Sequence, residues 1–282
     1  MDTIADFSTI ATLSGYEFES ACRYHTQYAY LGDHIGLCKI LTRAKIHVDT
    51  RDVGVTPHLI MDGFWETWLT QCLSGIVKPG NVCLDIGANF GYYSVLMSNL
   101  AGANGSVLAV EPNAALCKLL RRTSSIASHN FKVAEVALSD IAGEAQLSIH
   151  DGYLGNSSLI DRKDQGFTDV TTMSVRMTTL DALAEQYGLT KIDVVKIDVE
   201  GLEPQIFRGM AKTLADNPDI KIVVEYSPHL YTDPGQFTDF LFEKFTVTRI
   251  KDVESPMVLT EADRHSLLHL TDHTDLLLSR KV

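Results

Sequence analysis

One short segment constrains the fold of this chain more than any other, because an apolar run leads directly into a glycine-containing loop. Residues 82–86 read Val-Cys-Leu-Asp-Ile, which is typical of a strand buried in a parallel sheet. The loop from Asp85 to Gly91 follows at once, and residues 91–101 have the pattern of a helix. Glycines let a backbone turn sharply and approach a ligand, and a helix N-terminus offers free amide donors. The segment therefore predicts a ligand site at the end of a strand in an α/β protein.

The rest of the chain after residue 80 continues to alternate between strand-like and helix-like segments. Such alternation predicts a doubly wound, mostly parallel sheet of seven strands with helices on both faces. Ligands on such sheets bind beyond the carboxyl ends of the strands. The other expected elements are strands at 106–110, 133–138, 192–197, 220–224, 245–250 and 275–278, and helices at 113–129, 202–215 and 237–242.

Two segments depart from this alternation. Residues 144–180 hold two strand-like stretches around a segment rich in Gly, Asn and Ser, so we expect a hairpin-like insertion there. Residues 1–78 have a weaker pattern, and we expect an N-terminal cap that packs on the sheet and closes over the substrate. We therefore divide the chain into this cap, residues 1–78, and a ligand-binding domain, residues 79–282.

Composition excludes several classes of function. The chain has 24 Lys and Arg against 36 Asp and Glu, a formal net charge of −12, which disfavours nucleic acid as a partner. No apolar run approaches the length of about 18 residues that a membrane span needs. The N-terminus carries acid where a signal peptide needs a basic residue, so we expect a cytoplasmic protein without a membrane span.

Neither the cysteines nor the acids indicate a metal. The five cysteines are scattered and form no CxxC pair, which predicts neither a disulfide framework nor a zinc site. Asp198, Glu200 and Glu225 end neighbouring predicted strands and offer oxygen ligands of the kind that magnesium prefers. Their spacing is not diagnostic, and we predict no metal.

Two acids at successive strand ends identify the ligand of the glycine loop. Glu111 ends the second predicted strand, where a carboxylate can accept hydrogen bonds from both hydroxyls of a ribose. Asp85 would repel a pyrophosphate but attract the sulfonium and ammonium groups of S-adenosylmethionine (SAM). The loop also lacks the GxGxxG pattern of a dinucleotide site. Either acid alone would be read as a cap or a surface charge, but together they favour SAM over NAD.

The third predicted strand ends in Ser139 and Asp140, at the edge expected to face the adenine. Either side chain is placed to meet the exocyclic amine of the base. Asp140 is equally suited to cap the turn that follows. Both interpretations stay open.

Several motifs of the chain match a known family. They are Gly63-Phe-Trp-Glu66, Asp85-Ile-Gly-Ala-Asn-Phe-Gly-Tyr-Tyr93, Val110-Glu-Pro112, Ala137-Leu-Ser-Asp140, Asn156-Ser-Ser158 and Lys196-Ile-Asp-Val-Glu-Gly-Leu-Glu203. In these pieces the chain resembles the FkbM-type SAM-dependent methyltransferases, over roughly residues 45–230. The last motif is the most specific, whereas many methyltransferases share the glycine loop.

The resemblance implies a class I methyltransferase fold, SAM as the methyl donor and, usually, an oxygen acceptor. Known acceptors in the family include hydroxyls of glycan sugars and of polyketide-type metabolites. By the same resemblance Asp85, Gly87, Asn89, Gly91 and Glu111 hold the cofactor. To this cofactor set we add Glu66, Ala88, Tyr92, Pro112, Ser139, Asp140 and Asp198.

Methyl transfer requires that an acceptor be aligned and, for an alcohol, that its proton be removed. Asp198 and Glu200 follow the fourth predicted strand and are both candidate catalytic residues, and Asp198 is expected to orient the acceptor or take its proton. Alternatively Asp198 caps the next helix together with Glu203. His229 titrates in a useful range and is a candidate general base, although a lone loop histidine is more often solvated. Residues 156–158 are candidates for contact with a polyhydroxylated acceptor, or else are turn residues.

The sequence therefore predicts a SAM-dependent O-methyltransferase that acts on a hydroxyl of a small molecule, either a sugar or glycan or a secondary metabolite. An NAD-dependent oxidoreductase on a similar sheet and a non-catalytic SAM-binding module are the alternatives. Nothing in the sequence identifies the methylated atom or the oligomeric state, so N-methylation and carboxyl methylation stay open.

Overall fold

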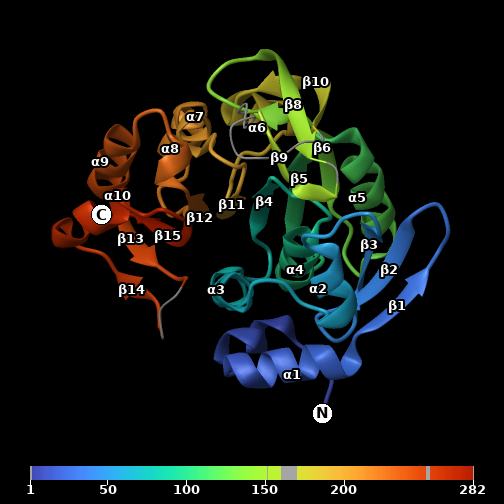
Figure 1. Cartoon of the computed structure of the whole chain (residues 1–282). Coiled ribbons are helices and arrows are strands. Elements are labelled where there is room, and N and C mark those ends of the chain that lie inside the picture. The colour runs from blue at the N-terminus through green and yellow to red at the C-terminus, as the bar shows by residue number, and fades with distance from the viewer. Residues whose placement is uncertain (1, 151, 160–169, 252–254, 282) are drawn as a thin grey trace.

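The computed structural model describes residues 2–150, 152–159, 170–251 and 255–281 (Figure 1). Its centre is an eight-stranded sheet with the order β14-β13-β15-β12-β11-β4-β5-β6. The strands β6, β5, β4, β11 and β12 run parallel, and β15 is antiparallel to both β12 and β13. The strands are β4 (Val82–Ile86), β5 (Ser106–Glu111), β6 (Lys132–Glu135), β11 (Val194–Ile197), β12 (Lys221–Tyr226), β13 (Phe245–Arg249), β14 (Met257–Val258) and β15 (Thr274–Arg280).

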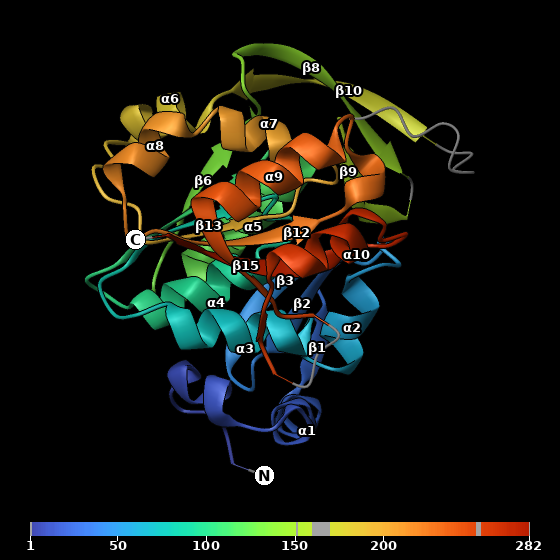
Figure 2. The same ribbon diagram turned by 90° about the vertical axis from the view of Figure 1, so that its left-hand side faces the viewer.

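Helices cover both faces of this sheet, so the prediction of a doubly wound, mostly parallel α/β fold is confirmed. Figure 2 shows α3 and α4 on one side of the sheet and α6 to α9 on the other. The short edge strand β14 makes eight strands where the sequence predicted seven. The helices are α3 (Thr67–Ile76), α4 (Tyr92–Ala101), α5 (Ala114–Ile126), α6 (Leu180–Tyr187), α7 (Glu203–Arg208), α8 (Ala211–Asp216), α9 (Pro234–Lys244) and α10 (Arg264–Leu268).

The central strands form where they do because their side chains are apolar on both faces. The burial of β11 is complete along its length, and only the first residue of β4 is partly exposed. Leu84 of β4 belongs to the hydrophobic core that includes side chains of α6 to α10, whereas Cys83 belongs to the core that includes side chains of α3 to α5. Alternate residues of one strand thus supply the two hydrophobic cores on opposite faces of the sheet.

Two predicted elements are divided in the structure. The predicted strand 133–138 is β6 followed by β7 (Ala137–Leu138), which leaves the central sheet and pairs with another strand. The predicted helix 202–215 is the pair α7 and α8, which Gly209 separates. A Cβ atom on Gly209 would lie 2.1 Å from the carbonyl oxygen of Ser139. This close backbone approach explains why the helix is interrupted at a glycine.

The insertion is larger than the hairpin that we expected. The strands β8 (Gly143–His150), β9 (Tyr153–Ser158) and β10 (Val170–Thr178) join β7 in a second sheet of order β7-β10-β8-β9. Its small core consists of Ala137, Leu147 and Val175. Figure 1 shows β8 and β10 above the ends of β4 and β5, so the insertion lies over the edge where a ligand is expected.

The N-terminal residues form a compact layer against α4 and α5. They comprise a three-stranded antiparallel sheet and helices that share one hydrophobic core with α4 and α5. No helix within the described ranges is long and apolar enough to span a bilayer. The elements are η1 (Phe7–Thr12), α1 (Gly15–His25), β1 (Gln27–Tyr30), β2 (Ile35–Ile40), β3 (Ala44–Asp49), α2 (Thr56–Met61) and α3.

The alternation of β4 predicts a large cost for truncating its central side chain. Leu84 has no solvent-exposed surface, so Leu84→Ala should lower the free energy of unfolding by about 3 kcal/mol through lost burial and a residual cavity. Met61 is 70% exposed, and Met61→Ala is the control, with an expected change within about 0.5 kcal/mol. Urea denaturation followed by circular dichroism measures both, and equal losses would contradict this assignment of the core.

Candidate functional site

A cleft lies beyond the carboxyl ends of β4, β5 and β11, under the insertion. The glycine loop, the end of β5 and the segment after β11 all line this cleft, and so does the insertion through Leu147, Ser157 and Leu159. It therefore occupies the position that the strand alternation predicted. Seven residues predicted from the sequence to act in the site line it, namely Gly87, Asn89, Glu111, Pro112, Ser157, Asp198 and Glu200. The apolar part of the lining is Ile86, Val110, Val136, Ala137, Leu138, Val199 and Leu202 with the two insertion leucines.

The glycine loop is held in a conformation that other residues adopt poorly. Gly87 has φ +75°, and a Cβ atom on it would lie 1.8 Å from the carbonyl oxygen of Asp198. The amides of Gly87 and Ala88 donate to the carbonyl of Val110 at 3.0 and 3.1 Å, so the loop is fastened to β5. Gly91, with φ +92°, is the N-cap of α4. Contacts within the protein therefore hold the loop backbone at the edge of the cleft.

Glu111 is a buried carboxylate in the lining of the cleft. Its Oε2 accepts a hydrogen bond from the backbone N–H of Asn89 at 3.0 Å, and its Oε1 accepts one from the backbone N–H of Asn113 at 2.9 Å. Burial raises the pKa of Glu111 to about 7, although the two amide donors act in the opposite direction. The side chain is thus held between the glycine loop and the start of α5, and its charge changes near neutral pH.

Asp85 lies behind the glycine loop and not in the lining of the cleft. It has no solvent-exposed surface, and its Oδ2 accepts a hydrogen bond from the Ser94 hydroxyl at 2.6 Å. Its Oδ1 accepts no hydrogen bond from the described residues, and Lys196 Nζ lies 3.8 Å away. Burial raises the pKa of this carboxyl, while Lys196 lowers it. The structure therefore places Asp85 in the protein interior, beside Ser94 and Lys196.

Asp198 follows β11 and faces the cleft. Its side chain is 34% exposed, and its Oδ2 lies 3.2 Å from Lys196 Nζ. The N-cap residue of α7 is Leu202, without a side-chain capping bond, so Asp198 does not cap that helix. Glu203 instead accepts hydrogen bonds from the amides of Val199 and Gly201, which fixes the segment that carries Asp198. Glu200 lies in the same segment, with φ +60°.

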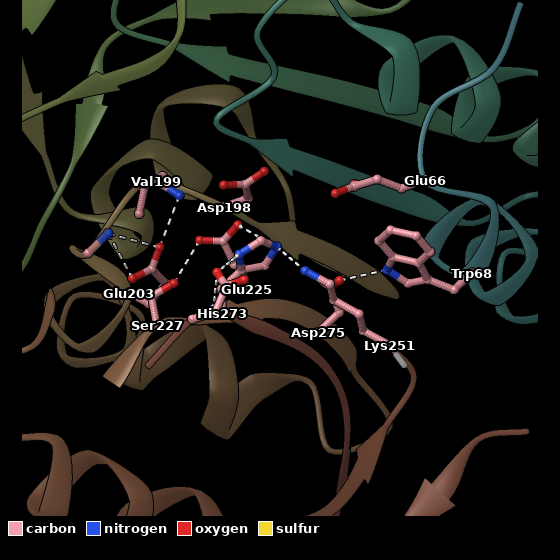
Figure 3. Close-up of polar contacts among 12 residues, drawn as sticks. Glu66, Trp68, Asp198, Val199, Glu203, Glu225, Ser227, Lys251, His273 and Asp275 are labelled. Atoms are coloured by element: carbon pink, nitrogen blue, oxygen red, sulfur yellow. Dashed lines mark hydrogen bonds and ion pairs between the residues drawn. The ribbon is translucent and has the colours of Figure 1, made fainter. Parts of the chain in front are cut away.

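Further carboxylates surround the side of Asp198 that faces away from the insertion. We call Glu66, Asp198, Glu225 and Asp275 the acidic rim (Figure 3). Figure 3 shows the carboxylates of Glu66 and Asp198 turned toward each other across a common space. Glu225 and Asp275 are partners in the register of β12 and β15, so two neighbouring strands present them together.

Three members of the acidic rim, Glu66, Glu225 and Asp275, each accept a hydrogen bond from a neighbouring side chain. Glu66 Oε2 accepts from the Tyr93 hydroxyl at 2.5 Å, and Asp275 Oδ2 accepts from the Trp68 indole at 2.7 Å. Glu225 Oε1 accepts from the Ser227 hydroxyl at 2.9 Å. The donors Tyr93, Trp68 and Ser227 come from α4, α3 and the end of β12.

The acidic rim is an environment that resists further negative charge. Burial, together with the nearby Asp275, raises the pKa of Glu66 to about 7. Burial raises the pKa of Glu225 well above its ordinary value, and the Asp198 carboxylate adds to this effect. With a pKa of about 7, Glu66 is partly protonated at neutral pH, and a protonated carboxyl can donate a hydrogen bond.

Several residues predicted for the site lie elsewhere. Tyr92 is buried, with its hydroxyl 3.1 Å from that of Thr70. Asp140 pairs with Arg208 at 2.8 Å and contacts the Ser139 hydroxyl at 3.2 Å, and neither Ser139 nor Asp140 lines the cleft. His229 is exposed in the short helix η3 (Pro228–Leu230).

Other groups near the cleft had no predicted role. Lys196 and Asp275 were not assigned to the site from the sequence. Lys196 carried a usable signal, because a lysine within the apolar run Val-Val-Lys-Ile must find a partner when it is buried. Among the described residues, no three His, Cys, Asp or Glu side chains are arranged to hold a metal ion.

Comparison with known proteins identifies the family. The FkbM methyltransferase domain matches residues 85–247. The methyltransferase sdnD of Sordaria araneosa is 28% identical over 173 residues, which cover 51% of this chain and 66% of that protein. The hexuronic acid methyltransferase AglP of Haloferax volcanii is 26% identical over 173 residues, which cover 61% of this chain and 66% of that protein. The chain thus spans just under two thirds of the length of these two relatives.

Among solved structures, the O-methyltransferase of Bacillus cereus in complex with SAH matches with a TM-score of 0.41 and 12% identity, over 71% of this chain and 74% of that one. The family match covers more than half of the chain and includes the glycine loop, Glu111, Asp198 and Glu225. The resemblance first seen in the sequence motifs is confirmed: this chain belongs to the FkbM methyltransferase family.

Proposed function

We propose that this protein is a SAM-dependent methyltransferase that holds SAM in the cleft and its acceptor beside the acidic rim. The observation that carries the proposal is Glu111, a carboxylate fixed at the end of β5 beside a glycine loop that begins at the end of β4. A carboxylate in this position suits the two hydroxyls of a ribose. Membership of the FkbM family supports the same activity.

The residues of the cleft fit SAM. Gly87 exposes backbone where a side chain would not fit, and Asn89 Oδ1 is buried without a hydrogen-bond partner among the described residues. We propose that Glu111 holds the ribose, that the loop around Asn89 holds the methionine end, and that the apolar lining covers the adenine. That lining is Val136, Ala137, Leu138 and Leu147. When bound, SAM would supply an activated methyl group on a sulfonium.

We propose that Asp198 orients the acceptor and receives its proton. It lines the cleft and also belongs to the acidic rim, and the ammonium of Lys196 lies beside it. In O-methylation a bond forms between the acceptor oxygen and the methyl carbon as the carbon–sulfur bond breaks, and the hydroxyl proton passes to the carboxylate. Glu200 lines the same part of the cleft and is a second candidate for acceptor contact. The role of His229 as a general base stays a prediction, and its side chain is exposed.

The acceptor that we propose is a hydroxyl of a sugar, a glycan or a secondary metabolite. A relative that is named a hexuronic acid methyltransferase supports a carbohydrate. Ser157, which lines the cleft from the insertion, adds a polar group suited to a polyhydroxylated molecule. The negative charge around Asp198 disfavours a nucleic-acid acceptor.

We further propose that residues 1–78 close the acceptor side and that residues 79–282 form the SAM-binding methyltransferase domain. Glu66 and Trp68 reach the acidic rim from the N-terminal segment, and Trp68 donates to Asp275 of β15. The two segments thus meet at the rim through a hydrogen bond between residues far apart in sequence.

The pKa of Glu111 predicts how SAM binding depends on pH. Ribose hydroxyls donate to the charged carboxylate, so SAM affinity should rise as the pH increases through about 7, where Glu111 loses its proton. Glu111→Gln should weaken SAM binding at pH 8 by about tenfold and remove this pH dependence. Isothermal titration calorimetry between pH 5.5 and 8.5 measures both effects. The matched control is Glu135→Gln, the exposed register partner on β6, which should behave as wild type.

Turnover tests the role of Asp198. A screen of glycans and sugar nucleotides with radiolabelled SAM would first identify an acceptor. Asp198→Asn should then reduce kcat by about a hundredfold, while SAM affinity changes far less. Asp216→Asn, at an exposed position on α8, is the control. Intact turnover in Asp198→Asn would place the active centre elsewhere, and SAM binding without turnover on any acceptor would favour a non-catalytic module.

A further inference from the structure

Lys196 is a charged side chain at the centre of the molecule. It is the third residue of β11, between β4 and β12, and its side chain is only 4% exposed. A lysine in the middle of an apolar strand costs free energy unless its ammonium is paired. Its position therefore requires an explanation from its contacts.

The ammonium of Lys196 connects two segments that end neighbouring strands. Nζ donates to the carbonyl of Gly87 at 3.1 Å, and it lies 3.2 Å from Asp198 Oδ2 and 3.8 Å from Asp85 Oδ1. The ring of Tyr93 covers it, with its centroid 5.4 Å from Nζ. The three oxygen partners belong to the glycine loop, to the segment after β11 and to the buried end of β4.

The same two segments also touch directly. The space in which a Gly87 side chain would lie is filled by the carbonyl of Asp198. A backbone contact of this kind fixes the distance between the two loops but does not direct the Asp198 carboxylate. The bond from Lys196 to the Gly87 carbonyl and its ion pair with Asp198 supply that direction.

Without Lys196 the carboxylates at this edge would repel one another. Five carboxylates from different elements lie near Lys196 or Asp198. Charge on Asp198 contributes to the raised pKa of Glu66, Glu225 and Asp275. Burial alone disfavours the charged ammonium, but Asp198 and Asp85 outweigh it and hold the pKa of Lys196 above its ordinary value. The facing carboxylates are Asp85 of β4, Glu66 before α3, Glu225 of β12, Asp275 of β15 and Glu203 of α7.

We propose that Lys196 is a positioning residue that ties the glycine loop to Asp198, so that the cofactor side and the acceptor side of the cleft move as one unit. The inference rests on the proposed function only in assigning these two sides to cofactor and acceptor. The tie itself is a property of the protein without ligands, and it can be measured there.

Hydrogen exchange of the ligand-free protein tests the tie. In Lys196→Met, amides of 87–91 and of 198–202 should exchange together, each about tenfold faster or more than in wild type, because both lose one anchor. Amides of β5 and β12 should keep their wild-type rates. The control is Lys221→Met. Lys221 is the first residue of β12, at the end of the strand away from the cleft, and contacts Ser279, so its loss should leave exchange in both loops unchanged. Faster exchange in only one loop, in neither, or uniformly along the chain would overturn the proposal.

The pH profile of SAM affinity gives a second readout that loss of packing alone would not change. Lys196 lowers the pKa of Glu111, whereas Asp85 raises it and the Asn89 and Asn113 amides lower it. In Lys196→Met the pH at which SAM affinity is half-way through its rise should therefore be higher than in wild type. Lys196→Arg should restore this midpoint pH to the wild-type value. An unchanged midpoint in Lys196→Met would count against the tie.

A second pair of variants covers failure of Lys196→Met to fold. The double variant Lys196→Met/Asp198→Asn removes one charge of each sign and is compared with Asp198→Asn alone. The double variant should show faster exchange at 87–91 and a higher midpoint than the single variant, and identical behaviour would overturn the proposal. If wild type does not bind SAM, the proposed function fails, while the exchange measurement still decides whether Lys196 ties the two loops.

Discussion

The contact between Gly87 and the carbonyl of Asp198 is the constraint on which the site depends. Strand β4 lies between β5 and β11, so the segments that follow these strands meet at one edge of the sheet. Only a glycine allows the loop after β4 to come this close to the segment after β11. The contact brings the glycine loop, Glu111 and Asp198 to one cleft, although they are far apart in the sequence.

Charge is distributed unevenly around this contact. The apolar lining and the carboxylate of Glu111 lie toward the insertion, whereas the acidic rim lies toward α3 and β15. Asp198 belongs to both regions, and Lys196 is the buried cation beside it. Since burial and the nearby Asp275 raise the pKa of Glu66 to about 7, Glu66 can donate a hydrogen bond when it is protonated. This division between the Glu111 carboxylate on one side and the acidic rim on the other suits a site with two different ligands.

The sequence predicted the central sheet well because its strands are short apolar runs that end at glycine or acidic residues. The glycine loop and Glu111 were predicted for the same reason, since adjacent strand ends share an edge. Glu66 and Asp198 were predicted for the site and Glu225 was placed at a neighbouring strand end. Asp275 was not predicted, because it joins them only through the order of strands β12 and β15 and the packing of α3. The split of residues 133–138 also escaped prediction, since nothing local shows that β7 pairs with β10. Asp85 was expected to face the ligand, but its carboxylate lies in the protein interior beside Lys196 and Ser94.

A crystal structure of the protein grown with SAM or its demethylated product tests the central claim most directly. The account predicts a ligand in the cleft, with both ribose hydroxyls about 2.7 Å from the Glu111 carboxylate and the sulfur on the side of Asp198. A ligand bound elsewhere, or a ribose that makes no contact with Glu111, would contradict it.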